Sequence, residues 1–111
     1  MSMKVSTRQV DGVTILDLSG RITLGEGSVV LRDAIRDQLA KGNKSVLLNL
    51  GDVSYIDSSG IAALVEGFQS ARARGSRFAL VAVSDAVRAV LELARLDRVF
   101  LIVADRSAML G

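Results

Sequence analysis

Polar and apolar residues alternate along the first part of the chain, over residues 4–9 and again over residues 13–19. Asp11 and Gly12 separate these runs. Because glycine tolerates the positive φ that tight turns require, the pattern predicts a β-hairpin. The apolar positions of the second run are Val13, Ile15 and either Leu16 or Leu18. Residues 20–27 contain three glycines and predict a loop.

Three later segments have the period of an amphipathic helix. The first covers residues 28–41, and the second follows residue 57 and ends near Arg74. The third begins at Asp85, which we expect to be either the N-cap or an acidic residue of the first turn. Their apolar stripes are Leu31, Ile35 and Leu39 in the first, Ile61, Leu64, Val65, Phe68 and Ala71 in the second, and Val87, Val90, Leu91 and Ala94 in the third.

Short apolar runs at residues 45–50, 77–83 and 99–103 predict further strands, with residues 51–57 as a connection. The predicted order is therefore strand, strand, helix, strand, helix, strand, helix, strand. Repeated strand–helix–strand units favour a mostly parallel mixed sheet, to which the hairpin adds an antiparallel edge. We expect one α/β domain over residues 1–111.

The composition excludes several kinds of chemistry. The chain has no cysteine, so it has no disulfide, no thiolate metal site and no thiol nucleophile. It has no histidine, which removes the usual general base near neutral pH and the commonest metal ligand. We therefore expect no enzymatic activity, no metal and no cofactor. Gly25-Glu26-Gly27 lacks the ending of a phosphate-binding loop, so we interpret it as a flexible loop that caps the first helix.

Charge and hydropathy limit the partners and the location. The chain has 14 basic residues interspersed with 12 acidic ones, and only 4% of its residues are aromatic. Direct nucleic-acid binding is not expected, because it requires clustered cations or stacking aromatics. No stretch approaches the roughly 18 to 20 apolar residues of a membrane span, and no signal peptide follows Met1. We expect a cytoplasmic protein.

The segment Asp57-Ser58-Ser59-Gly60 lies where a predicted connection meets the start of the second helix. Loops at the carboxyl ends of strands are where α/β proteins usually meet ligands and partners. A helix start also has unpaired N–H groups and a positive dipole end, so a phosphate on a serine there would be tolerated. A simpler interpretation is that Ser58 or Ser59 is only an N-cap, which is the commoner use of such residues.

The segment from Leu48 to Leu64 closely resembles the core motif of bacterial anti-sigma-factor antagonists, the STAS domain family. In that family an apolar strand and a short acidic connection precede Asp-Ser-Ser/Thr-Gly and an apolar helix. Residues 18–22 resemble the exit of the family's second strand, and residues 81–87 resemble the entry to its third helix. The resemblance covers essentially the whole chain and implies a single STAS-like domain.

The resemblance also implies a function, that of an anti-sigma factor antagonist. The family's phosphoacceptor directly follows the motif's aspartate, which makes it Ser58 here. In the family, the unphosphorylated domain binds an anti-sigma factor with serine kinase activity and so frees a sigma factor. The kinase reverses this by phosphorylating the serine, and a serine phosphatase resets it. The implied partner-binding residues are Thr23, Asp57, Ser58, Ser59, Gly60 and Ile61.

Two details of that implied surface depend on single residues. Gly60 is expected to let the partner's backbone come close. Thr23 stands where many members of the family carry an aspartate, which bears on the identity of the partner.

STAS domains also occur as non-phosphorylated structural subunits, for example in lipid-transport complexes, or as modules of larger signalling assemblies, and this is the alternative function. A monomer and a weak dimer both remain open.

Overall fold

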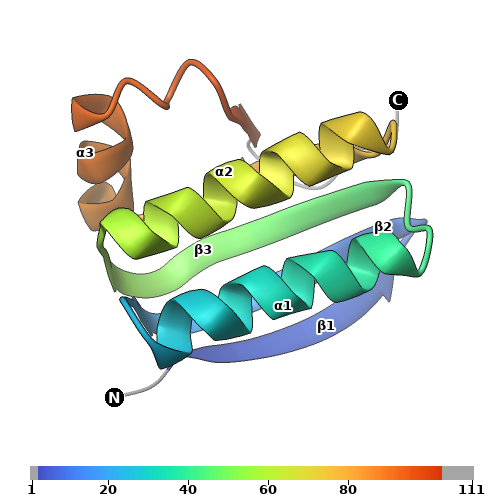
Figure 1. Ribbon diagram of the computed structural model, residues 1–111, viewed down its shortest axis with the longest axis horizontal. Helices are drawn as coiled ribbons and strands as arrows, with labels where there is room; N and C mark the ends of the chain where they lie inside the picture. Colours follow the sequence, from blue (N-terminus) through green and yellow to red (C-terminus); the bar gives the residue numbers. More distant parts are fainter. Residues whose placement is uncertain (1–2, 104–111) are drawn as a thin grey trace.

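The hairpin and the strand–helix units of the sequence form one mixed sheet in the computed structural model, which describes residues 3–103 (Figure 1). In chain order the elements are β1 (Lys4–Val10), β2 (Val13–Ile22), α1 (Glu26–Ala40), β3 (Ser45–Ile56), α2 (Ser58–Ala73), β4 (Arg77–Val81), α3 (Asp85–Leu93) and β5 (Leu101–Val103). The sheet order is β1-β2-β3-β4-β5, with β1 antiparallel to β2 and the other pairs parallel. The predicted fold class is therefore confirmed, while the ends of the domain predicted over residues 1–111 lie outside the described residues.

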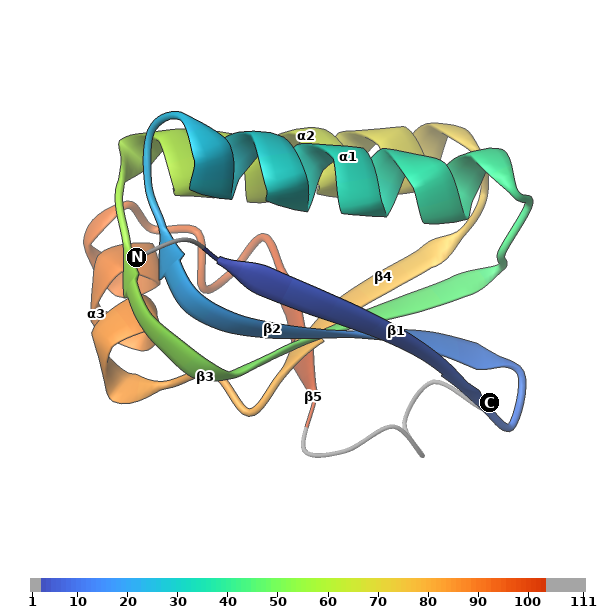
Figure 2. The same ribbon diagram turned by 90° about the horizontal axis from the view of Figure 1, so that it is seen from below.

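The helices α1 and α2 lie side by side on one face of the sheet, whereas α3 lies at the end of the sheet (Figure 1, Figure 2). The shared face of α1 and α2 follows from the strand order, because successive right-handed crossovers in one direction place their helices on the same face. The main core lies between these helices and the sheet and includes Leu31, Ile35, Leu48, Leu64 and Leu80. The starts of α1 and α2 consequently meet at the edge where β2 and β3 end.

Strand β3 is longer than predicted, so the expected connection over residues 51–57 is wrong for most of its length. The strand continues to Ile56 and stays paired with β2, with Asp52 opposite Ser19 and Tyr55 opposite Arg21. The register shifts twice along this part of the pair. Pairing with a long neighbouring strand stabilises the extended backbone here, although Gly51 and Asp52 are residue types that strands usually lack.

Strand β2 is buried on both faces over residues 13–16, so the alternation of polar and apolar residues predicted for this strand does not match its burial. Residues 13–16 are each at most 2% exposed. Leu16 packs in the main core against the helices, whereas Ile15 packs with Leu47 and Ala79 in a second, smaller cluster. Inner strands of largely parallel sheets carry such continuous apolar runs, because both of their faces are covered.

The ends of several elements differ from the prediction by a few residues. Helix α1 begins earlier, at Glu26, while β4 ends at Val81 and β5 begins at Leu101. At the start of α3, Ser84 is the N-cap and accepts a hydrogen bond from a backbone N–H. Of the two roles expected for Asp85, the acidic residue of the first turn is therefore confirmed.

Candidate functional site

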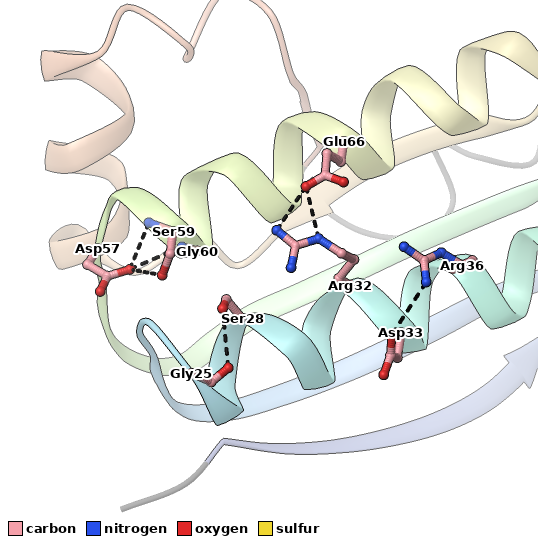
Figure 3. Close-up of polar contacts among 9 residues, drawn as sticks. All are labelled: Gly25, Ser28, Arg32, Asp33, Arg36, Asp57, Ser59, Gly60 and Glu66. Carbon is pink, nitrogen blue, oxygen red and sulfur yellow. Dashed lines mark hydrogen bonds and ion pairs between the residues drawn. The ribbon is translucent and has the colours of Figure 1, made fainter.

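The segment Asp57-Ser58-Ser59-Gly60 lies where β2 and β3 end and α2 begins (Figure 3). Strand β3 stays paired with β2 up to Ile56, which lies opposite Ile22. The next backbone N–H, that of Asp57, donates to the carbonyl oxygen of Ile22 at 3.1 Å. This bond extends the sheet pairing by one residue, so the chain leaves the sheet at Asp57 and Ser58 is the first helical residue.

Asp57 is the N-cap of α2, so the simpler interpretation that Ser58 or Ser59 is the cap is wrong. Oδ1 of Asp57 accepts hydrogen bonds from the backbone N–H groups of Ser59 at 2.9 Å and Gly60 at 3.1 Å. The hydroxyl of Ser59 donates to the same oxygen at 2.6 Å. A carboxylate suits this place because it satisfies N–H groups that lack helical partners and faces the positive end of the helix dipole.

The second carboxylate oxygen of Asp57 reaches outside its own helix. Oδ2 accepts a hydrogen bond from the backbone N–H of Leu24 at 3.0 Å, in the loop between β2 and α1. The Ser59 hydroxyl is the main cause that holds the pKa of Asp57 below its usual 3.8, with help from the N–H groups of Leu24, Gly60 and Ser59. The group is therefore a carboxylate near neutral pH, and it connects the two helix starts.

The two adjacent serines have different surroundings. Ser59 is partly buried, and its hydroxyl is engaged by Asp57. Ser58 is exposed, and none of the side-chain hydrogen bonds within residues 3–103 involves its hydroxyl. A modifying enzyme can thus reach Ser58 without breaking a contact of the fold, whereas modification of Ser59 would remove a bond to the helix cap.

A phosphate on Ser58 would find the next three backbone N–H groups of the helix start already bonded. The N–H groups of Ser59 and Gly60 already donate to the Asp57 side chain, and that of Ile61 donates to the Asp57 carbonyl oxygen at 3.0 Å. The dipole of α2 would still favour the negative charge, whereas the neighbouring carboxylate of Asp57 would oppose it. Such a phosphate would therefore stay in solvent, where it alters the surface and leaves the fold unchanged.

Gly60 is buried, and its hydrogen atoms face the protein's own core. A Cβ at this position would lie 2.6 Å from Cγ1 of Ile56 and 2.7 Å from the carbonyl oxygen of Ile22. Real Cβ atoms essentially never come so close to other heavy atoms, so glycine is required for α2 to rest on the ends of β2 and β3. The expectation that Gly60 makes room for a partner's backbone is corrected: the room is used within the chain.

The remaining predicted partner residues, Thr23 and Ile61, are both partly buried. Thr23 is partly buried, and its carbonyl oxygen accepts a hydrogen bond from the N–H of Ser28 at 3.0 Å. Ile61 is partly buried and packs against the main core. The large apolar side chain that this loop exposes is Leu24, which the sequence pattern did not indicate. Its bond to Asp57 joins residues 33 positions apart, and no local signal marks such a contact.

Gly25-Glu26-Gly27 was predicted to be a flexible loop that caps the first helix, but only Gly25 lies outside α1, and Glu26 and Gly27 are its first helical residues. Gly25 is the N-cap, with φ of 96° and ψ of −126°, and Glu26 is the acidic residue of the first turn.

Within residues 3–103 no group of three or more acidic side chains is placed to hold a metal ion. None of the described helices is long and apolar enough to cross a membrane.

The family model of the STAS domain matches residues 4–108. The chain belongs to the STAS domain family. A Thermotoga maritima protein described as a proposed anti-sigma factor antagonist has the same fold, with a TM-score of 0.85 and 31% identity over 95% of this chain and 90% of that one. An anti-sigma factor antagonist of Mycobacterium paratuberculosis has a TM-score of 0.84 at 23% identity, over 96% and 89% of the two chains.

The Bacillus cell fate determinant SpoIIAA, in its phosphorylated form, has a TM-score of 0.72 at 18% identity, with 96% of each chain covered. At the identities of the Mycobacterium and Bacillus proteins the likeness is one of fold. The STAS fold of this chain is thus shared with proteins described as anti-sigma factor antagonists, and one of these, SpoIIAA, has also been observed in a phosphorylated form.

Proposed function

We propose that this STAS domain is an anti-sigma factor antagonist that is switched at Ser58. Its unphosphorylated form binds an anti-sigma factor with serine kinase activity, which frees a sigma factor. Phosphorylation of Ser58 by that kinase ends the interaction, and a serine phosphatase restores it. This role places the protein in the cytoplasm and requires binding rather than catalysis by the chain itself.

The observation that carries the proposal is the exposed hydroxyl of Ser58, on the first residue of α2 and beside a rigidly bonded cap. A kinase needs its acceptor hydroxyl free and held at a defined place. Asp57 supports the second requirement, because its carboxylate is bonded to both α2 and the loop before α1. The 31% identity to the Thermotoga protein, over nearly the whole of both chains, supports the same class of partner.

The physical basis of the switch is charge at a packed interface. Phosphorylation adds about −1.5 to −2 charges at pH 7. A kinase surrounds the acceptor hydroxyl with the γ-phosphate of ATP and with metal-binding acids, so a phosphoserine brings a second anion to the same place. The Asp57 carboxylate adds to the repulsion. A loss of about 3 kcal/mol is enough to lower the affinity more than a hundredfold.

The test is the affinity of the full chain for each purified anti-sigma serine kinase encoded in the same genome, measured by calorimetry with ADP or ATP present. Ser58→Ala is expected to bind within about threefold of the parent, and Ser58→Asp more than about a hundredfold more weakly. Ser70→Asp is the matched control, because it places the same charge on an exposed position of the same helix. Position 70 lies about 18 Å along the helix axis from Ser58.

Full binding by Ser58→Asp, or equal weakening by Ser70→Asp, would contradict the switch. If no kinase of the set binds the parent chain, the proposed function is wrong. The alternative, a non-phosphorylated subunit of a lipid-transport or larger signalling complex, then predicts a partner whose affinity depends neither on nucleotide nor on charge at Ser58.

A further inference from the structure

Leu24 is 81% exposed, although it lies directly beside the candidate site. It occupies the loop between β2 and α1. Exposure alone assigns it no role, because single exposed apolar side chains are common on protein surfaces. Leu93, at the end of α3, is 87% exposed and illustrates this point.

The backbone of Leu24 is held in place by hydrogen bonds, although its side chain is exposed. Its N–H donates to Oδ2 of Asp57 at 3.0 Å. On one side of it the carbonyl oxygen of Thr23 accepts from the N–H of Ser28, and on the other side Gly25 caps α1. The loop is therefore tied to both helix starts, and an apolar side chain is presented to solvent from a fixed base.

We infer that Leu24 is the apolar contact of the partner-binding surface and enters an apolar pocket of the anti-sigma factor that binds at Ser58. This inference rests on the proposed function. The reason is that Leu24 and Ser58 are connected through Asp57. The carboxylate of Asp57 accepts from the Leu24 N–H and also caps α2, whose first residue is Ser58. The side chains of Leu24 and Ser58 thus lie on one surface whose backbone is fixed by Asp57, so a partner that covers Ser58 also contacts Leu24.

The physical advantage of this arrangement is that little is lost on binding. Burying the apolar surface of a leucine is favourable, and a backbone that is already fixed avoids most of the ordering cost. The two residues then have separate tasks. Leu24 contributes affinity that is insensitive to salt, because apolar contacts are not screened, whereas the charge added at Ser58 decides whether the complex forms.

The experiment is calorimetric titration of the full chain against the same purified anti-sigma serine kinases. Leu24→Ala is expected to weaken binding about tenfold or more, with a loss that is the same in low and high salt. Leu24→Met, which keeps a long apolar side chain, is expected to bind within about threefold. Leu93→Ala is the matched control for truncating an exposed leucine and is expected to bind within about twofold of the parent.

The possible results separate this inference from the proposed function. If Leu24→Ala binds like the parent while Ser58→Asp does not bind, the role of Leu24 is wrong and the switch stands. If the parent chain binds none of the kinases, both are wrong. Equal weakening by Leu93→Ala also overturns the inference. So does a change in self-association by sedimentation velocity at unchanged affinity for the kinase, because it assigns Leu24 to a contact between copies of the chain.

Discussion

The starts of α1 and α2 lie at the same edge of the sheet (Figure 3), yet their unpaired N–H groups are satisfied in different ways. At α1 the N-cap is Gly25, which makes no side-chain cap, and the Thr23 carbonyl oxygen accepts from the N–H of Ser28 instead. At α2 the carboxylate of Asp57 caps the first turn. One helix start is thus built from the backbone and the other from a charged side chain.

As a result, one residue, Asp57, holds both the start of α2 and the loop before α1. Asp57 serves its own helix through Oδ1 and the loop before α1 through Oδ2. The cap of α1 is a glycine, which has no side chain with which to reach α2. A change at the start of α2 therefore reaches the loop that carries Leu24, and the substitutions below test this asymmetry.

Gly60→Ala is expected to have the largest effect on stability, because it fills the space on which α2 rests. Alanine favours a helix by about 1 kcal/mol over glycine. The new Cβ would nevertheless lie 2.7 Å from the backbone carbonyl oxygen of Ile22, which cannot move aside cheaply. We expect the clash to outweigh the helix preference and to lower the free energy of unfolding by about 2 kcal/mol, measured by chemical denaturation.

Gly51→Ala is the control for the loss of a glycine at this edge. Its Cβ would lie 3.3 Å from its nearest neighbours, the Cβ of Ala82 and Oδ1 of Asn49, so small adjustments suffice. We expect a change within about 1 kcal/mol. Equal losses for Gly51→Ala and Gly60→Ala would mean that the close packing of Gly60 does not determine the position of α2.

Asp57→Ala is expected to cost about 1 kcal/mol of unfolding free energy, the usual effect of losing an N-cap side chain. It also removes the acceptor of the Leu24 N–H, so the amide of Leu24 should exchange with solvent faster in the native state. Asp57→Asn retains an acceptor oxygen and should lose less unfolding free energy than Asp57→Ala.

Ser84→Ala separates the loss of stability from the effect on the loop, because it removes the cap of another helix, α3, and the Ser84 side chain makes no hydrogen bond to the loop of Leu24. It should lower stability by about the same amount and leave the exchange of the Leu24 amide unchanged. If Asp57→Ala leaves that exchange unchanged as well, the connection between the two helix starts has no effect on the loop.

The smallest expected effect is on the pH dependence of stability. The pKa of Asp57 lies below 3.8 in the folded chain, so its contribution is present above that pH and is lost as the pH falls through the folded value. Asp17 behaves in the same way, because Arg8 bonds to its carboxylate and lowers its pKa. Ser59→Ala removes the main cause of the shift at Asp57, so the carboxyl should titrate closer to 3.8 by NMR. An unchanged titration in Ser59→Ala would contradict the hydrogen bonding described here.

The sequence predicted the fold better than the site, because helix and strand periods are local. The stripe of Leu31, Ile35 and Leu39 is buried in α1 as expected. The wrong predictions concern features that depend on contacts between residues far apart in the sequence. The segment after Leu50 was predicted to be a connection, yet it is strand because β2 pairs with it up to Ile56. Burial of both faces of β2 likewise depends on its inner place in the sheet.

At the site, the position of Ser58 at a strand–helix junction could be predicted, because the motif and the change of period coincide there. Which of three neighbouring polar residues caps the helix could not, since Asp57, Ser58 and Ser59 are all suited to it. The geometry selects Asp57 and so leaves the hydroxyl of Ser58 free. The bond from Leu24 arises only when two loops meet in the folded chain.

The most direct test of the switch is to identify the residue that carries phosphate. The full chain is incubated with its binding kinase and ATP, and the product is sequenced by mass spectrometry with fragmentation between Ser58 and Ser59. We expect phosphate on Ser58, none on Ser59, and no incorporation into Ser58→Ala. Phosphate on Ser59 or elsewhere, with Ser58 unmodified, would contradict the account.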